Sequence, residues 1–242
     1  CLLCCLPFRK SSDVEEDDEE FNLGTLHHVR IHVGFADVYQ SIREDVMQTL
    51  LERLKFCKER GETPKVYITG HSLGGAVASL FALNLASLQL PGASGGASQG
   101  GRELQHSDIE LFQLQPAPVV YTFGAPRLGN ASMRSIYNGL VPNTFRMVAA
   151  LDLVPTMPPS IYYRQVGREI WLDEGGGITY VMSWAMRALL PARNSPQCHA
   201  QVVYIRLLNK AFHRLYGMNF PSAWTGEDDM QGVLDASVRV EA

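Results

Sequence analysis

Short apolar runs alternate along the chain with longer segments in which apolar residues recur at helical spacing. The short runs are rich in β-branched and aromatic residues and are bounded by Gly, Pro or Asp, which predicts buried strands. Four such strands are expected, over residues 66–70, 119–123, 144–149 and 170–172. A further strand that enters a turn is predicted at 29–35. Because strands alternate with helices, we expect an α/β fold with a mostly parallel sheet.

Helices are predicted between these strands. They cover residues 42–58, the segment from residue 73 to about 90, residues 132–140 and residues 198–216. In the first helix, the residues that fall on one apolar face are Val46, Leu50, Leu54 and Cys57, with Leu51 alongside. In the last helix, the corresponding residues are Val202, Ile205, Leu208 and Phe212. We expect these faces to be the buried sides of the two helices.

The composition divides the chain into three parts. Residues 1–28 begin with Cys and hold seven acidic residues among the eight of 13–20, so this segment is expected to be solvated and disordered. A single α/β domain is predicted over 29–220. It carries a flexible surface insertion at 91–116, which opens with a low-complexity run rich in Gly and Ser. A C-terminal tail is expected at 221–242.

The overall composition is that of a globular protein that can bury a sizeable core. Of its 242 residues, 46% are hydrophobic and 19% are charged. The formal net charge of −4 gives no electrostatic support for a nucleic-acid partner. No apolar run reaches the length of a membrane span. No cofactor is expected.

Three of the five cysteines, Cys1, Cys4 and Cys5, stand at the start of the chain. An odd number with this clustering does not fit a disulfide framework, so a reducing, intracellular location such as the cytoplasm or a plastid is favoured. Two interpretations of the cluster remain open. One is S-acylation that holds the segment against a membrane, and the other is the end of an apolar segment that lies upstream. Zinc binding is not expected, because no fourth ligand lies nearby.

The most informative motif is the Gly-x-Ser-x-Gly pattern of Gly70, His71, Ser72, Leu73 and Gly74. In a nucleophile elbow this pattern turns a buried strand directly into a helix and leaves the serine at the tip in a strained conformation. Gly70 and Gly74 are expected to avoid side-chain clashes where strand and helix crowd together. The N–H of Leu73 is the expected oxyanion donor. A simple loop would carry the same pattern, but the β-prone run before it and the small, apolar helix after it favour the elbow.

A serine nucleophile needs a histidine base and an acid that orients it, in the chain order Ser, Asp or Glu, His. Of the three histidines that follow the elbow, His106 lies in the insertion and His213 lies within the last helix. His199 stands at the start of that helix after a breaker, so it is the predicted base. Asp152 directly follows a strand and should lie at the same edge of the sheet as the elbow. It is therefore the predicted acid, and Asp173 is the alternative.

At this point the chain resembles the class 3, or fungal-type, lipases, a family that includes plant phospholipase A1-like enzymes. The resemblance covers roughly residues 30–207 in separate blocks. These blocks are His32–Phe35, Thr69–Ala76, Thr122–Asn130, Asp152–Pro155, and His199 with Tyr204. The resemblance implies an α/β-hydrolase fold and an acyl-enzyme mechanism in which Ser72, His199 and Asp152 are nucleophile, base and acid. It also implies that the substrate is an acylglycerol or a polar glycerolipid.

One element of the family pattern is not found. In the family, a second oxyanion donor comes from an Arg-Gly-Thr or Arg-Gly-Ser turn well upstream of the His-x-Gly-Phe block. The comparable residues here are Gly24 and Thr25, which lack the Arg and lie only a few positions before His32. We therefore expect the chain to be truncated at its N-terminus. Three functions remain open: an active ester hydrolase, a catalytically impaired binding or scaffold protein, and a serine acyltransferase.

Apolar residues also gather shortly before the predicted base. They are Tyr180, Val181, Met182, Trp184, Met186, Leu189 and Leu190. One interpretation is an acyl groove or a contact with a lipid surface, which would make the protein peripheral to a membrane. A helix of the core would have the same composition, so both interpretations remain open.

Overall fold

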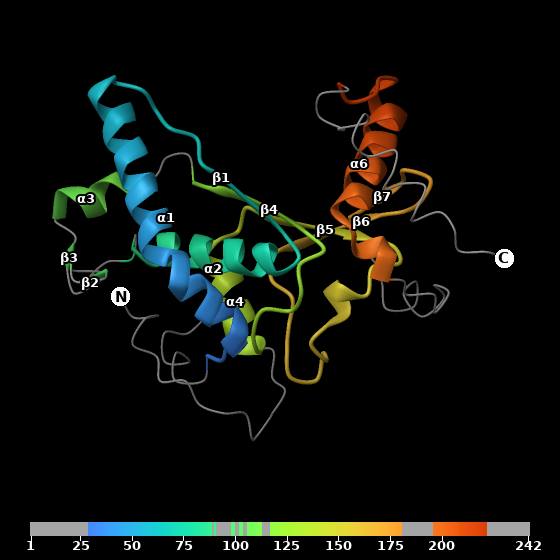
Figure 1. The fold of residues 1–242 in the computed structure, drawn as a ribbon, viewed down its shortest axis with the longest axis horizontal. Coiled ribbons are helices and arrows are strands. Elements are labelled where there is room, and N and C mark those ends of the chain that lie inside the picture. Colours follow the sequence, from blue (N-terminus) through green and yellow to red (C-terminus); the bar gives the residue numbers. More distant parts are fainter. Residues whose placement is uncertain are drawn as a thin grey trace.

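A five-stranded sheet forms the centre of the protein (Figure 1). The computed structural model describes residues 29–88, 90, 98–99, 102–103, 106–112, 117–180 and 196–221. In sheet order, the strands are β1 (Tyr67–His71), β4 (Val119–Phe123), β5 (Thr144–Ala149), β6 (Arg168–Leu172) and β7 (Ile178–Thr179). The first four are parallel, and β7 pairs antiparallel with β6. The mostly parallel sheet and the four strands predicted within it are confirmed.

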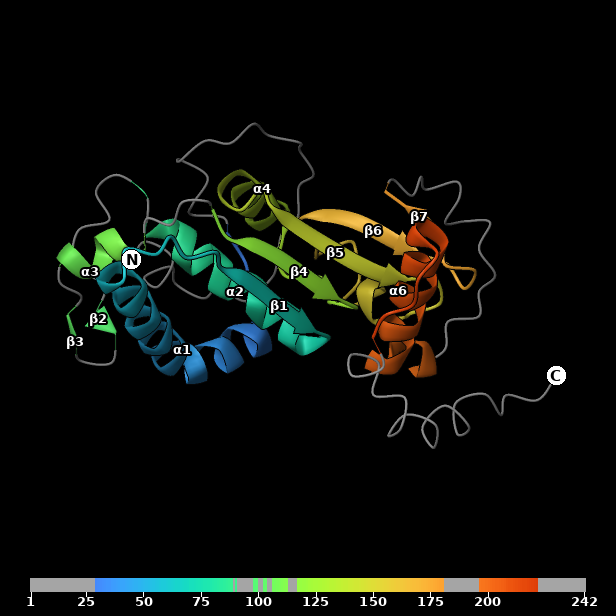
Figure 2. The same ribbon diagram turned by 90° about the horizontal axis from the view of Figure 1, so that it is seen from above.

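Helices pack on both faces of this sheet (Figures 1 and 2). The helices of one face are α1 (Val33–Glu59), α2 (Leu73–Ser87) and α4 (Ala131–Leu140). Of these, α2 contacts β1 and β4 directly, and α1 packs outside α2. The opposite face is covered by α6 (Gln201–Tyr216), which contacts β5 and β6. Two short 3-10 turns are η3 (Val154–Thr156) and η4 (Pro196–His199).

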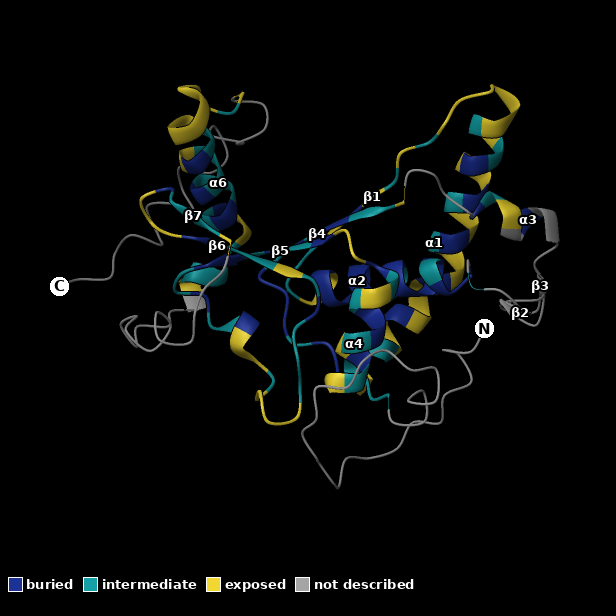
Figure 3. Cartoon of the chain, turned by 180° about the vertical axis from the view of Figure 1, so that it is seen from behind, coloured by how far each residue is buried: buried dark blue, intermediate teal, exposed yellow. Residues whose placement is uncertain are grey.

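The sheet separates two apolar clusters. The larger cluster fills the space between the sheet and the helices α1, α2 and α4, and it includes Met47 and Val120. The smaller cluster joins α6 to β5 and β6 through Ala149, Leu172 and Tyr204. Figure 3 shows that α2 is buried along most of its length, whereas α1 keeps an exposed outer side. Strands β5 and β6 are therefore covered on both faces, whereas Tyr67 and Thr69 of β1 are exposed on the face opposite α2.

The prediction of a strand at 29–35 is wrong. Ile31 forms only an isolated bridge with Gly129, and α1 already begins at Val33. The carbonyl of His32 accepts hydrogen bonds from the N–H groups of Phe35 and Ala36, which closes the first turn of the helix. The β-branched and aromatic residues of this segment favour a strand locally, but the contacts of Phe35 with the core and with the His32 ring favour the helix.

The predicted buried face of α1 is rotated from the observed one. The buried residues of the helix are Tyr39, Arg43, Met47, Leu51 and Leu54. Leu51 and Leu54 were expected there, whereas Val46, Leu50 and Cys57 are only partly buried. The buried face contains Arg43, so a prediction based only on apolar positions selects the adjacent face of the helix.

The predicted helix over 198–216 is interrupted near its start. The turn η4 ends at His199, Ala200 is extended, and α6 begins at Gln201. The buried residues of α6 are Val202, Tyr204, Leu207 and Ala211, of which Val202 was predicted. Tyr204 turns inward because its hydroxyl hydrogen-bonds buried groups next to β5.

The segment predicted as a flexible insertion contains regular structure. Strands β2 (Ser98–Gln99) and β3 (Arg102–Glu103) pair antiparallel, and a short helix α3 (His106–Leu111) follows. The Lys55 Nζ atom of α1 lies 2.7 Å from a carboxylate oxygen of Asp108, and Phe112 is buried in the larger cluster. Phe112 therefore anchors this end of the segment to the core, and the flexible insertion at 91–116 stays a prediction.

Several sequence predictions lie outside the described residues. These concern the acidic N-terminal segment with Cys1, Cys4 and Cys5, most of the C-terminal tail, and all of the apolar cluster before His199 except Tyr180, which is exposed. The boundaries of the predicted domain stay predictions. Within the described part of the chain, no helix combines the length and the apolar character that crossing a membrane requires.

The corrected face of α1 can be tested with two neighbouring residues. Truncating the buried Met47 to Ala leaves a cavity in the larger cluster and should lower the free energy of unfolding by about 2–5 kcal/mol. Val46→Ala, the matched control on the predicted face, should cost about 1 kcal/mol or less, because Val46 is only partly buried. Urea denaturation measures both values. Equal losses in the two variants would contradict the observed register.

Candidate active site

The parallel strands bring the predicted site residues to one edge of the sheet. Ser72 directly follows β1, Gly124 directly follows β4, and Asp152 lies three residues after the end of β5. Because β1, β4 and β5 run in the same direction, their carboxyl ends meet at this edge. His199 reaches the same edge from the end of η4, directly before α6 begins.

Ser72 occupies a strained turn between β1 and α2. Its backbone angles are φ 56° and ψ −128°, and it is the one non-glycine residue with positive φ in the part of the chain that the structure describes. Such conformations cost roughly 1–3 kcal/mol and persist only where the surroundings enforce them. Here the Ser72 N–H donates to the carbonyl of Phe123 at 2.9 Å, and the Ser72 carbonyl accepts from Gly75 at 2.9 Å. The turn is thus tied both to β4 and to the helix that follows.

Two glycines are required by close backbone approach at this turn. A Cβ atom on Gly70 would lie 2.1 Å from the carbonyl oxygen of Gly74. One on Gly75 would lie 2.8 Å from the Cβ of Ala125 and 3.2 Å from that of Thr122. A Cβ on Gly74 would meet no atom within 4 Å. The steric role predicted for Gly70 is therefore confirmed, whereas the one predicted for Gly74 is wrong and belongs to Gly75.

Ser72, His199 and Asp152 form a continuous hydrogen-bonded chain. The Ser72 Oγ atom lies 2.7 Å from His199 Nε2, and His199 Nδ1 lies 2.8 Å from Asp152 Oδ2. An ionised carboxylate only accepts hydrogen bonds, so Nδ1 carries a proton and Nε2 accepts from the serine hydroxyl. The Asp152 side chain is fully buried, and that of His199 is 19% exposed. The structure therefore brings together the three residues selected from the sequence.

Further donors hold the Asp152 carboxylate. The Val154 N–H donates to Oδ1 at 2.8 Å, and the Tyr204 hydroxyl donates to Oδ2 at 2.5 Å. The Tyr204 oxygen in turn accepts from the N–H of Ala149 at 3.2 Å. Burial raises the pKa of Tyr204 far above its usual value, and the negative charge of Asp152 raises it further. The hydroxyl therefore stays protonated and acts as a donor to the carboxylate.

From the sequence, Tyr204 was named only as part of a family block, and no structural role was predicted for it. Its spacing from His199 could have indicated that role. A tyrosine one helical turn into α6 can reach back over the strand ends when the helix starts at Gln201. The interruption at Ala200 sets this register, and it was not predicted.

Gly124 leaves room for the acid and the base. Its φ is +60°, and a Cβ atom there would lie 2.7 Å from Asp152 Oδ2, 2.9 Å from Tyr204 Oη and 3.0 Å from His199 Cε1. Both the conformation and the space exclude a larger residue at this position. The Phe-Gly-Ala-Pro run after β4 therefore has a direct steric role at the site.

Side chains also connect the loop after β4 with the loop that carries Asp152. The amide of Gln165 donates to the carbonyls of Ala125 at 3.1 Å and of Pro155 at 2.8 Å. Arg127 donates through Nη1 to the carbonyls of Thr156 and Pro158. These bonds stabilise η3 against β4 and so fix the backbone that presents the acid.

The alternative residues lie elsewhere. Asp173 is exposed, and its carboxylate caps the turn between β6 and β7 by accepting from the N–H groups of Gly175 and Gly177. His213 is exposed on α6, and His106 begins α3 at the far end of α1. Asp173 and His213 have no hydrogen bond to Ser72 in the described structure, and the described position of α3 separates His106 from the elbow in the fold.

The start of α2 provides the predicted oxyanion donor. Leu73 is the first residue of the helix, so its N–H has no carbonyl partner within α2. The Leu73 side chain is 43% exposed, which places this helix end near solvent. Gly24 and Thr25, considered above for a second donor, lie outside the described residues.

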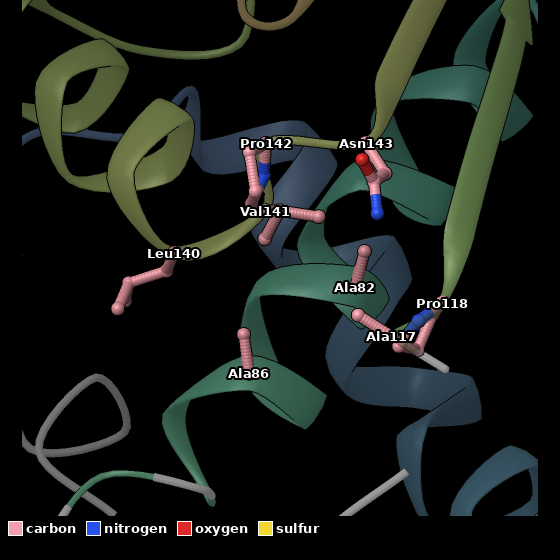
Figure 4. A pocket seen from close by; sticks show the side chains of 8 residues that line it. All are labelled: Ala82, Ala86, Ala117, Pro118, Leu140, Val141, Pro142 and Asn143. Carbon is pink, nitrogen blue, oxygen red and sulfur yellow. The ribbon is translucent and has the colours of Figure 1, made fainter. Parts of the chain in front are cut away.

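A small pocket lies at the opposite end of the strands (Figure 4). Its volume is about 30 Å³, and it is lined by residues that precede β4 and β5, among them Pro118 and Asn143. A cavity of this size holds little more than a water molecule, whereas ligand pockets measure roughly 300 Å³ or more. Among the described residues, no group of three or more His, Cys, Asp or Glu side chains could hold a metal ion.

The fold and the site together define an α/β-hydrolase with a Ser-His-Asp arrangement at the carboxyl edge of its sheet. The chain belongs to the class 3 lipase family, since the sequence model described as lipase (class 3) matches residues 8–162. The resemblance found in the sequence is thereby confirmed.

Curated relatives are similar over part of their length. A lipase from Rhizomucor miehei is 30% identical over 146 residues, which cover 60% of this chain and 33% of the relative. Phospholipase A1-II 3 from Oryza sativa subsp. indica is 29% identical over 157 residues, which cover 59% of this chain and 33% of the relative. The match thus spans about a third of the length of these relatives.

Solved structures share the fold. Lipase II from Rhizopus niveus superposes with a TM-score of 0.55 at 22% identity, over 74% of this chain and 60% of that chain. A triacylglycerol lipase whose catalytic centre is described as a serine protease triad gives a TM-score of 0.54 at 24% identity, over 82% of this chain and 64% of that chain. These likenesses confirm the α/β-hydrolase fold.

The glycines at the start of α2 provide a matched test of the turn geometry. Gly75→Ala should lower the free energy of unfolding by about 1–3 kcal/mol, because the new Cβ overlaps Ala125 and Thr122. Gly74→Ala should be neutral or stabilising by up to about 1 kcal/mol, because its Cβ points into open space and Ala favours a helix. Urea denaturation compares the two. A larger loss for Gly74→Ala would contradict the geometry described here.

Proposed function

We propose that the protein is a serine carboxylic-ester hydrolase that acts on acylglycerols or polar glycerolipids. One observation carries the proposal: Ser72 Oγ, His199 and Asp152 are connected by hydrogen bonds of 2.7 and 2.8 Å beside the start of α2. A serine, a base and an orienting acid in this geometry are what nucleophilic ester cleavage requires. Membership of the class 3 lipase family supports the choice of an ester substrate.

In the first half of the reaction, the Ser72 oxygen attacks the carbonyl carbon of the ester while its proton passes to His199 Nε2. Asp152 keeps the imidazole in the required tautomer and stabilises the imidazolium that forms. The ester C–O bond then breaks, and His199 gives its proton to the departing alcohol oxygen. The acyl group remains bound to Ser72.

In the second half, water replaces the alcohol. His199 takes a proton from the water, the resulting hydroxide attacks the acyl carbonyl, and the bond to Ser72 Oγ breaks. The proton returns to the serine, and the fatty acid leaves. The negative charge on the carbonyl oxygen in both halves faces the N-terminal end of α2, where the Leu73 N–H is the proposed donor.

The choice of lipid esters follows from the relatives and from the surface near the site. The relatives include enzymes named as lipases, as a secreted mono- and diacylglycerol lipase and as a phospholipase A1. Large apolar residues are exposed at Leu73, which follows Ser72, and at Met157, Ile161 and Tyr162 in the loop after η3. Such residues favour contact with acyl chains or with a lipid surface. A peripheral contact with such a surface is part of the proposal.

Replacing the nucleophile tests the proposal directly. Ser72→Ala should lower kcat for a soluble short-chain ester by on the order of 10³-fold or more, because no acyl-enzyme can form. A fluorophosphonate probe should label the unmodified protein at Ser72 and leave this variant unlabelled. The matched control is Ser41→Ala, which removes a hydroxyl from the exposed side of α1 and should change neither result.

Two outcomes would overturn the proposal. One is full esterase activity in Ser72→Ala, which would mean that another group performs the attack. The other is the absence of both labelling and hydrolysis in the folded, unmodified protein. Product analysis with an added alcohol acceptor separates hydrolysis from acyl transfer.

The tyrosine that supports the acid should also affect turnover. Tyr204→Phe removes the hydrogen bond to Asp152 Oδ2 and should lower kcat by about 10- to 100-fold, since hydrogen bonds to charged groups contribute about 1.5–3 kcal/mol. Substrate affinity should not change, because the hydroxyl does not face the substrate side of Ser72.

Tyr137→Phe is the matched control for this change. Burial raises the pKa of Tyr137 to about 12, and its hydroxyl hydrogen-bonds Thr144 at 2.9 Å, away from the triad. The control should lose stability to a similar extent, measured by thermal unfolding, while keeping its kcat. An equal loss of kcat in both variants would show that Tyr204 acts through stability alone.

A further inference from the structure

A second histidine lies against the proposed base. His71 is the last residue of β1 and directly precedes Ser72. Its ring stacks on that of His199, with centroids 4.7 Å apart and planes inclined by 29°. The ring of Tyr204 meets His71 edge-on at 5.8 Å. His71 is therefore packed between the ring of His199, the proposed base, and the ring of Tyr204, which hydrogen-bonds the acid. It has no hydrogen bond to the Ser72 hydroxyl or to the Asp152 carboxylate in the described structure.

His71 also holds the backbone of His199. The His71 Nε2 atom lies 2.7 Å from the carbonyl oxygen of His199. A carbonyl oxygen only accepts hydrogen bonds, so Nε2 carries a proton and donates it. This bond joins residues 128 positions apart in the chain. It connects the strand that carries the nucleophile directly to the residue that carries the base.

Local hydrogen bonds also shape the backbone around His199. The N–H of Ala200 bonds to the carbonyl of Gln197, and that of Val203 bonds to the carbonyl of Ala200. These bonds shape the junction between η4 and α6 but do not attach it to the sheet. The bonds of the imidazole itself orient the ring, whereas the bond from His71 fixes the main chain from which the ring projects.

We propose that His71 is a positioning residue that sets the distance between Ser72 Oγ and His199 Nε2. The inference rests on the proposed function and deepens it. Because His71 and Ser72 are adjacent, one end of β1 places both the nucleophile and, through the His71 side chain, the base. An apolar side chain in this place fills the space but cannot donate to the carbonyl.

Three substitutions separate the effect of the His71 hydrogen bond from the effect of its aromatic ring. His71→Phe keeps an aromatic ring and removes the donor, whereas His71→Gln keeps an N–H donor of similar reach. We expect kcat for a soluble short-chain ester to fall about 10- to 100-fold in His71→Phe, as small misplacements of catalytic groups do, with KM unchanged. His71→Gln should recover most of the loss. His32→Phe is the matched control: this histidine stacks on Phe35 at the start of α1 and should keep its kcat.

A measurement without substrate makes the test independent of activity. The Nδ1 proton that His199 donates to Asp152 should give a low-field resonance in the proton NMR spectrum of the 242-residue chain. We expect this resonance to broaden or vanish in His71→Phe and to persist in His71→Gln and in Ser72→Ala. Ser72→Ala abolishes turnover without disturbing the bond between His199 and Asp152.

The two readouts distinguish failure of the inference from failure of the proposed function. If His71→Phe keeps both the kcat and the resonance of the unmodified protein, the positioning role is overturned. If the unmodified protein hydrolyses no ester but the resonance responds as expected, the proposed function fails and the positioning role stands. If His71→Phe does not fold, His71→Leu takes its place beside His71→Gln. Equal kcat and equal resonances in that pair then overturn the inference.

Discussion

The strained turn at Ser72 is the constraint on which the other features of the site depend. The serine adopts a positive φ only because bonds to Phe123 and Gly75 hold it there. Those bonds require that α2 begins at once after β1 and lies close to β4, which in turn requires a hydrogen atom in place of a side chain at Gly70 and Gly75. The small residues along α2, the parallel pairing of β1 with β4 and the direction of the first helical N–H groups all follow from this one turn.

The site also depends on how the acid is stabilised. The Asp152 carboxylate is fully buried, so protein groups must replace the hydrogen bonds that water would make to it. Asp152 finds them on three elements: the N–H of Val154 in η3, the Tyr204 hydroxyl in α6 and the His199 ring at the end of η4. These groups come from three separate elements, so the carboxylate has all its partners only when α6 has packed on β5 and β6 through the smaller cluster. The contact between His71 and the base adds a connection that the motif alone does not explain.

Much of this could be predicted from residues that are close in sequence. The strands at 119–123 and 144–149 were predicted because β-prone runs end at Gly124 and near Asp152, and the elbow was predicted because its pattern lies between a strand and an apolar helix. The three residues of the hydrogen-bonded chain were selected by their order and by their places at element ends. The faces of α1 and α6 were not predicted correctly, because Arg43 and Tyr204 are polar residues that turn inward to partners or packing supplied by other elements.

The sequence by itself determined the α/β class, the order of the elements, the position of the turn at Ser72 and the choice of His199 and Asp152 from a few candidates. These features depend on the secondary-structure propensity of short segments, on the spacing of apolar residues and on the order of residues in the chain. All three can be read from residues that are close in sequence. Only the tertiary structure decided which glycine beside Ser72 is sterically required, which face of each helix is buried, and that Tyr204 and His71 contact the acid and the base. Those features are distances between residues far apart in the chain, and they exist only after the helices have packed against the sheet.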